Sequence, residues 1–377
     1  MSNYLVKFTP LEPYFFGGEK SLVFGDSKKG KLNSYFIRSN EQPSQTTLLG
    51  ALRYCCIDNI RKDYEFDPKI IGADSFQIDA SQKQSFGVIQ AISPLFLICD
   101  AANELESTGI YIKTPFDHIQ KEDEKYTPFK DYFGIETEHG IRLLTSDFNA
   151  KNGITDSYIN LTNEKVRSDL FLSDIRTGIN KRAKDEGLFK KEHKMLKEGF
   201  SFAIYAEIER EMQNRVVYLG QKKSAFSVVF IKQDESFSDK LADLKAKTTK
   251  LLCKYPIKYS AINMDFTDSK AVNIIDLIDD CVIKAVALSD LYVSPELLYQ
   301  HSLFASTKTN DFRTFSTKKQ AKCSYTDRFS RGNTLIRMIA AGSFFILKEQ
   351  AEFDKAMQNE QCMQIGYNTI AYGGKKI

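Results

Sequence analysis

Two short segments near the start of the chain have the residue types of a phosphate-binding surface. Residues 11–18 (LEPYFFGG) run from an apolar strand into a Gly-Gly turn, and residues 43–53 (PSQTTLLGALR) are a polar loop that opens a helix. A strand end, a glycine turn and a helix start all present unpaired backbone N–H groups, which suit phosphate oxygens. Neither segment carries an obvious nucleophile, metal cluster or acid–base pair. Together they predict a surface that holds a nucleic acid rather than one that cleaves a small substrate.

Positive charge is concentrated in a few stretches, although the net charge is only +3. Residues 176–199 hold eight Lys or Arg against four acids, residues 308–337 hold eight against two, and Lys375 and Lys376 follow a Gly-Gly pair. By contrast, residues 263–302 hold seven acids and two lysines. A solvated charged face is the ordinary reading of any one basic run. The scarcity of acids in 308–337, and its interleaved Phe and Tyr residues, favour a single-stranded nucleic acid there.

The apolar pattern predicts an α+β chain that positions these segments. The order strand, helix, strands, followed by strands, helix, strands, is typical of two ferredoxin-like (RRM-type) domains, which we place at residues 1–198 and 199–377. Residues 25–42 are expected to form a loop or an exposed hairpin, and residues 113–170 an irregular insertion. Strands are predicted at residues 4–8, 86–99, 200–209, 215–219, 226–231 and 336–347. The second of these is broken at Ser93-Pro94 and the last at residues 340–343. Helices are predicted to begin at residue 44 and to span residues 238–252 and 353–360.

Composition indicates an intracellular protein. The seven cysteines are odd in number, lack CxxC spacing and mostly lie in apolar runs, which is typical of reduced, packed thiols. No basic stretch followed by an apolar one opens the chain, and the longest apolar runs are too short to span a bilayer. We therefore expect a cytoplasmic protein with no membrane partner.

Two features of the sequence could indicate catalysis rather than binding alone. A metal-independent endoribonuclease would need a general acid and base, and His193 lies among lysines that could stabilise a scissile phosphate. No second histidine is near it in the sequence, and a histidine on a helix surface is the commoner reading. Asp279 and Asp280 beside Cys281 form an acidic corner, but no HxH, HD or CxxC spacing supports a metal site, so no metal or cofactor is expected. An acidic patch facing a basic partner subunit is the simpler reading of that corner.

Six segments, taken in order, resemble signature stretches of one family. They look like those of the RAMP superfamily of CRISPR proteins, and their order most resembles the third-subunit family of the type III-B (Cmr) effector complex. The segments span nearly the whole chain: residues 8–16, 43–53, 176–180 (RTGIN), 217–220 (VYLG), 339–344 (IAAGSF) and 366–374 (GYNTIAYGG).

The resemblance implies a non-catalytic RNA-binding subunit with two ferredoxin-like domains, long insertions and a protruding β-hairpin. Such subunits grip the 5′ handle of the CRISPR RNA and bridge the large polymerase-cyclase subunit to the backbone RAMP filament. Their hairpin reaches along the duplex of guide and target RNA, and they act in antiviral defence. Residues 308–335 and 112–165 are both candidates for that hairpin. Residues 219–223 (LGQKK) depart from the glycine-rich turn of the family, and residues 366–374 have fewer glycines than many members.

The predicted RNA contacts come from two sources. The residues themselves indicate Phe16, Gly17, Gly18, Lys20, Lys318, Lys319, Arg328, Arg331 and Lys375. The resemblance implies Ser44, Gln45, Thr46, Thr47, Arg53, Arg176, Gly178, Asn180, Arg182, Gly342 and Ser343.

Overall fold

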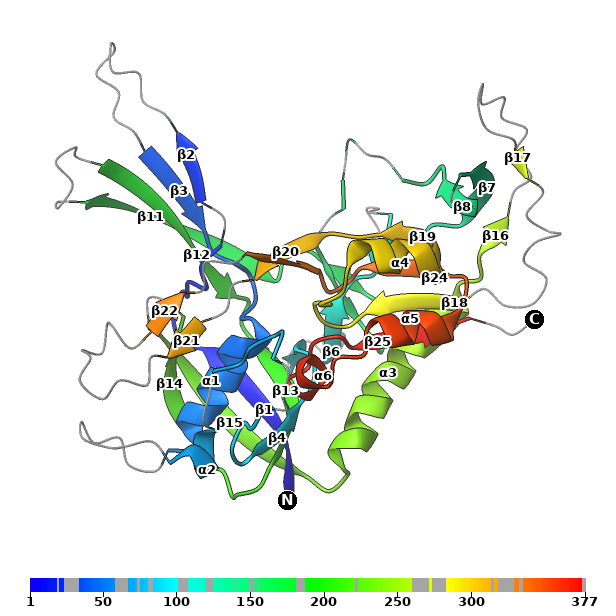
Figure 1. The fold of residues 1–377 in the computed structure, drawn as a ribbon. Helices are drawn as coiled ribbons and strands as arrows, with labels where there is room; N and C mark the ends of the chain where they lie inside the picture. The colour runs from blue at the N-terminus through cyan, green and yellow to red at the C-terminus, as the bar shows by residue number, and fades with distance from the viewer. Residues whose placement is uncertain are drawn as a thin grey trace, which may run out of the picture.

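The chain folds into a mixed α+β structure, which confirms the predicted class (Figure 1). Among the described residues, no helix combines the length and the apolar character needed to cross a membrane. The computed structural model of the 377-residue chain describes all residues except 19, 24–33, 58–66, 73–74, 81–83, 101–107, 120–124, 139, 149–150, 152, 155, 181–186, 221–222, 260–270, 273–282, 313–314, 318–328, 332–334 and 375–377.

A nine-stranded sheet forms the main body. Its central strand β1 (Ser2–Pro10) alternates buried Tyr4, Val6 and Phe8 with half-buried residues, as the period-two pattern predicts. β1 pairs antiparallel with β13 on one side and β15 on the other. The remaining strands extend the sheet in both directions: β4 (Ile89–Ile92), β5 (Phe96–Cys99), β6 (Gly109–Lys113), β9 (Tyr158–Asn160), β10 (Val166–Arg167), β13 (Phe200–Ile208), β14 (Arg215–Leu219) and β15 (Ser224–Gln233).

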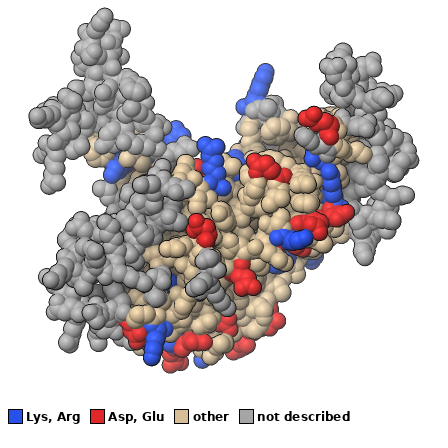
Figure 2. Space-filling view, in the orientation of Figure 1, with Lys and Arg blue, Asp and Glu red and all other residues tan. Residues whose placement is uncertain are grey.

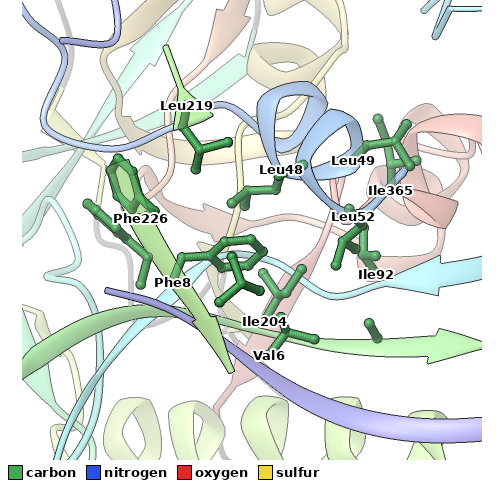
Figure 3. Close-up of a cluster of buried hydrophobic side chains, with 14 of the residues drawn as sticks. Val6, Phe8, Leu48, Leu49, Leu52, Ile92, Ile204, Leu219, Phe226 and Ile365 are labelled. Atoms are coloured by element: carbon green, nitrogen blue, oxygen red, sulfur yellow. The ribbon is translucent and has the colours of Figure 1, made fainter. Parts of the chain in front are cut away.

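Helix α1 (Gln45–Cys55) covers one face of this sheet. Ser44 caps it, accepting a hydrogen bond from the Thr47 backbone N–H, and the predicted helix start is therefore confirmed. Leu48 and Leu52 are fully buried against side chains of the sheet (Figure 3). Burying each leucine stabilises the fold by about 2 kcal/mol, so packing holds α1 more firmly than its cap does.

A four-stranded sheet projects from the body, and we call it the arm (Figure 1). β11 (Phe171–Asn180) and β12 (Gly187–Leu196) form its long antiparallel hairpin. β2 (Lys20–Val23) pairs antiparallel with β3 (Ser34–Arg38), and β3 joins β12 in parallel. Most of the loop or exposed hairpin predicted at residues 25–42 lies outside the described residues. The longest projecting hairpin thus lies outside both candidate ranges. Each range nevertheless holds a hairpin: β7 (Asp131–Thr137) with β8 (Gly140–Thr145), and β21 (Phe315–Thr317) with β22 (Phe329–Arg331).

The prediction of an irregular insertion over residues 113–170 was wrong in part. β9 and β10 continue the main sheet through pairing of β9 with β6, because Tyr158 and Ile159 are buried there. The rest of the stretch holds the β7–β8 hairpin, which is joined by the short strands β16 (Lys258–Tyr259) and β17 (Ala271–Val272).

The C-terminal region has its own four-stranded sheet with the order β19-β24-β18-β25. All of its strand pairs are antiparallel, and its chain order is strand, helix, strand, strand, helix, strand. Helix α3 (Phe237–Lys254) precedes this sheet in the chain and packs on β25. The elements that follow α3 are β18 (Ile283–Ala287), α4 (Pro295–His301), β19 (Ser302–Ser306), β20 (Thr309–Phe312), β23 (Ile336–Ile339), β24 (Phe344–Leu347), α5 (Gln350–Ala356), α6 (Glu360–Gln364) and β25 (Ile370–Gly373). The short helix α2 (Pro68–Ile71) follows α1 in the body.

The predicted boundary at residue 198 falls between strands of one sheet. β1 and β5 precede it, β13 and β15 follow it, and all four are hydrogen-bonded in the order β5-β13-β1-β15. The main sheet therefore draws on both predicted halves, and the division at 198 stays a prediction. So does the ferredoxin-like identity of both halves.

Candidate nucleic-acid interface

Two glycine turns meet at the base of the arm. Gly220 follows β14 with a φ of +73°, and a Cβ there would lie 2.4 Å from the Phe15 carbonyl oxygen. Gly18 approaches the arm closely, since a Cβ there would lie 2.4 Å from the Arg38 carbonyl oxygen. Only glycine permits both contacts, because any side chain would force these backbones apart. We call the surface formed by residues 16–18, Gly220 and the helix-start residues Ser44, Thr46 and Thr47 the cradle.

Hydrogen bonds hold the cradle against the arm. Tyr14 and Lys194 exchange backbone hydrogen bonds of 2.8 and 2.9 Å, which tie the segment before the glycine turn to β12. The Phe16 backbone N–H donates to the Ser39 hydroxyl at 2.9 Å. The Lys191 ammonium lies 5.6 Å from the centre of the Phe15 ring, within the range of a cation–π contact. The arm and the cradle therefore form one connected surface.

The helix start offers hydroxyl groups rather than free amides. Ser44 is exposed, Thr46 and Thr47 are half-buried, and their hydroxyls lie within 3.0 Å of the Ser44 oxygen. The Thr46 backbone N–H and hydroxyl both hydrogen-bond the buried Tyr367 hydroxyl. The predicted unpaired amides are therefore partly occupied from inside, and the Ser44 and Thr47 hydroxyls are the groups left beside the positive end of the helix.

Gln45 and Arg53 do not face the cradle, which corrects both predicted contacts. Gln45 is 4% exposed, and its Nε2 donates to the Ser93 carbonyl oxygen at 2.8 Å. The Arg53 guanidinium lies 5.3 Å from the centre of the Phe86 ring. Both side chains are used in packing α1 on the body, so their polarity serves the fold.

The turn at Gly342 and Ser343 is inside the protein, so these two predicted contacts are wrong. Ser343 is fully buried, and a Cβ at Gly342 would lie 2.8 Å from the Phe116 ring. The Gly342 N–H donates to the Ala287 carbonyl, and its carbonyl accepts from the Phe116 N–H, each at 2.8 Å. The turn joins residues 114–116 to the C-terminal sheet, where RNA has no access.

The arm carries the accessible part of the 176–182 segment. The Arg176 side chain is 53% exposed and donates to Asp174 at 2.8 Å. Gly178 lies under the Phe189 ring, where a Cβ would come within 2.4 Å of the ring, so this glycine serves hairpin packing. Arg182, Lys318, Lys319, Arg328 and Lys375 lie outside the described residues, and of Lys20, Asn180 and Arg331 only the backbone is described, in β2, β11 and β22.

The Glu192 carboxylate lies among the cations on one face of the arm. Glu192 accepts from the Lys194 ammonium at 2.7 Å and from the Ser173 hydroxyl at 2.5 Å, and Arg38 lies 4.0 Å away. Burial alone would raise the pKa of Glu192, but these hydrogen bonds outweigh it and hold the pKa below its usual range. The Arg38 side chain is 60% exposed. In Figure 2, Lys and Arg side chains lie around the base of the arm, whereas acidic side chains gather along the lower edge.

His193 lies on strand β12 rather than on a helix surface, which corrects that reading. It is 5% exposed, and its ring lies 5.5 Å from the Phe15 ring. Burial, together with the nearby Arg176, lowers its pKa. A buried imidazole cannot reach a ribose hydroxyl, so the histidine best suited to general base catalysis by sequence is poorly placed for it. The described residues contain no cluster able to hold a metal ion, and the corner at 279–281 lies outside them.

One feature of this surface was missed from the sequence. A groove of about 260 Å³ runs between α1 and β14 beside the cradle. Apolar residues on both faces of β14 were the available signal, since Val216 and Tyr218 are exposed while Val217 and Leu219 are buried. The lining residues are Thr47, Gly50, Ala51, Tyr54, Val217, Tyr218, Leu219 and Gly220.

No protein-family model matches the chain, and no curated protein matches it. The chain is similar to one in the "Cryo-EM structure of the Type III-B Cmr-beta bound to cognate target RNA and AMPPnP, state 1". The two chains share 10% sequence identity with a TM-score of 0.45, and the similarity covers 98% of each.

Proposed function

We propose that this protein is a non-catalytic RNA-binding subunit of a type III-B CRISPR effector complex. It grips the 5′ handle of the CRISPR RNA at the cradle, and its arm follows the RNA paired with its target. It bridges the large polymerase-cyclase subunit to the backbone RAMP subunits, and so contributes to antiviral defence. The six ordered segments that resemble the RAMP family motivate this assignment.

One observation carries the proposal: the glycine turn, the hydroxyls of the helix start and the cationic arm meet on one connected surface. Gly220 packs on Phe15, and the segment before Gly17 is hydrogen-bonded to β12. Small, polar and cationic groups in that arrangement suit a chain of phosphates, whose charge dominates the affinity of most RNA-binding proteins. The burial of His193 favours a surface that holds RNA without cutting it.

The salt dependence of RNA binding tests the proposal. The full chain should bind fluorescein-labelled single-stranded RNA and leave it intact, with log affinity falling by about 0.7 per contacted phosphate for each tenfold rise in salt. Replacing Arg38, Arg176 and Lys190 together by Ala should reduce that slope by up to about 2, since each exposed cation contacts one phosphate.

The matched control removes the same charge elsewhere. Lys232, Lys247 and Lys250 are exposed on β15 and α3, away from the arm, and their combined replacement by Ala should leave the slope unchanged. Equal slopes in both triple variants and the wild type would remove the arm from the RNA site. Discrete RNA fragments after incubation with the wild type would contradict the non-catalytic assignment.

A further inference from the structure

Two exposed tyrosines line the groove between α1 and β14. Tyr218 is 65% exposed and Tyr54 is 39% exposed, and both line the groove. Among the described rings, neither makes an aromatic contact with the other or with a third ring. Exposed aromatic rings with room beside them are the usual stacking platform for bases of single-stranded nucleic acids.

The groove is also the right size for one flat ring. Its volume of about 260 Å³ is below the range of roughly 300–1,000 Å³ typical of sites that enclose whole ligands. Gly50 lies on the exposed face of α1, and a Cβ there would meet no atom within 4 Å. A glycine in a helix interior costs about 1 kcal/mol relative to alanine, so its effect here is to keep the groove open at the expense of helix stability.

Continuity with the cradle indicates what occupies the groove. Thr47 and Gly220 belong to both surfaces, so a phosphate held at the cradle has its own base within reach of Tyr218 and Tyr54. No lining residue carries a carboxylate, which would repel RNA. The Arg215 guanidinium donates to the Tyr54 and Ile57 carbonyl oxygens, at 3.3 and 3.0 Å, and so ties β14 to the end of α1.

We propose that this groove is a base-binding site, in which Tyr218 and Tyr54 stack one unpaired RNA base next to the phosphates held by the cradle. The site rests on the proposed RNA-binding function and extends it from phosphate contacts to a base contact. β14 is the last strand of its sheet, and an added strand of a partner protein is the rival occupant. The two tyrosines and the shared residues of the cradle favour the base.

A pair of RNA probes separates base contacts from phosphate contacts. Fluorescein-labelled U10 and a 10-nucleotide abasic strand carry the same phosphates, but only U10 has bases. We expect Tyr218→Ala to weaken U10 binding by the full chain about fivefold to tenfold and to leave abasic-strand binding and the salt slope unchanged. Tyr218→Phe should bind both strands as the wild type does. Gly50→Leu, which fills the groove, should reproduce the selective loss.

The control variant is Tyr299→Ala, because Tyr299 is 44% exposed on α4, outside the groove. It should bind both strands normally. If Tyr218→Ala binds U10 as tightly as the wild type does, the base site is overturned and the edge of β14 is left to a protein strand. If it weakens both strands equally, the base site is also overturned. A wild-type protein that binds neither strand would overturn the proposed RNA-binding function and the base site with it, so the two failures are distinguishable.

Discussion

Two glycine turns with similar sequence signals differ in their exposure to solvent. At the cradle, Gly17 has a φ of +57° and a Cβ there would meet nothing within 4 Å. At the other turn, Gly342 has a φ of +89°, and a Cβ would collide with the Phe116 ring. Both turns satisfy the same backbone need for glycine, but a second layer of the protein covers only the latter. A glycine turn is therefore a candidate contact only where it keeps exposure to solvent, as Gly18 does and Gly342 does not.

The largest effect on stability is expected at a buried glycine. Gly366 has a φ of +83°, and a Cβ there would lie 2.1 Å from Gln45 Nε2 and 2.4 Å from the Ser93 carbonyl oxygen. Gly366→Ala should lower the free energy of unfolding by about 3 kcal/mol, since backbone strain and overpacking add. Calorimetric melting measures the loss, and RNA affinity below the melting temperature should be unchanged.

The control for that variant isolates backbone strain. Gly140 has a φ of +87° with no atom within 4 Å of a Cβ, so Gly140→Ala should lose only about 1 kcal/mol. Equal losses in the two variants would contradict the view that tight packing of the C-terminal region on α1 decides the role of Gly366.

The interior raises the pKa of a carboxyl group, whereas the arm lowers it, so the stability of the protein should depend on pH differently in the two regions. Burial raises the pKa of Asp117 to about 6, although hydrogen bonding from Tyr126 and the charge of Lys284 lower it. The folded state therefore holds a proton that the unfolded chain releases near pH 4, so the contribution of Asp117 to stability is present below pH 4 and is lost as pH rises through 6. Between pH 4 and 7 the wild type should lose up to about 3 kcal/mol relative to Asp117→Asn.

Melting temperatures of the two proteins across that pH range measure the effect. Glu192→Gln serves as the control, because the pKa of Glu192 is lowered instead, so its contribution to stability is lost as pH falls rather than as pH rises. A constant difference between the wild type and Asp117→Asn would mean that Asp117 stays charged in the folded state.

An intermediate effect is expected at the cradle itself. Gly220→Ala introduces strain at a φ of +73° and pushes the turn away from the Phe15 carbonyl. We expect about tenfold weaker RNA binding at a temperature where the variant is folded, equivalent to about 1.4 kcal/mol. Fluorescence anisotropy measures the RNA affinity of this variant and of Gly366→Ala under the same conditions. The comparison between turns at the surface and turns in the interior would fail if both variants bound RNA alike.

The smallest expected effect comes from the carboxylate of the arm. Glu192→Gln removes a negative charge that lies beside Lys194 and Arg38, so RNA affinity should rise about twofold at low salt, with the gain disappearing at high salt. Asp243→Asn breaks a similar pair with Lys247 on α3 and should change nothing. A fall in affinity on Glu192→Gln would show that Glu192 positions the cations rather than screening them.

Local structure was largely predictable from the sequence. The alternation of Tyr4, Val6 and Phe8 predicted β1, the hydroxyl before an apolar stripe predicted the cap of α1, and Ser93-Pro94 marked the break between β4 and β5. Each of these features depends on neighbours within a few residues. The arm was harder to predict, because β11 is an edge strand whose exposed apolar and charged residues follow no simple alternation.

The residue types and their spacing by themselves determined where the chain turns, where it is extended, where α1 begins and which segments are cationic. Only the tertiary structure decided which of these features face solvent. Packing of residues 114–116 buried the turn at Gly342, and Tyr367 occupied part of the helix start, while the meeting of β12, Phe15 and Gly220 left the cradle open. The physical reason is that burial depends on contacts between residues far apart in the sequence, and no local pattern encodes them.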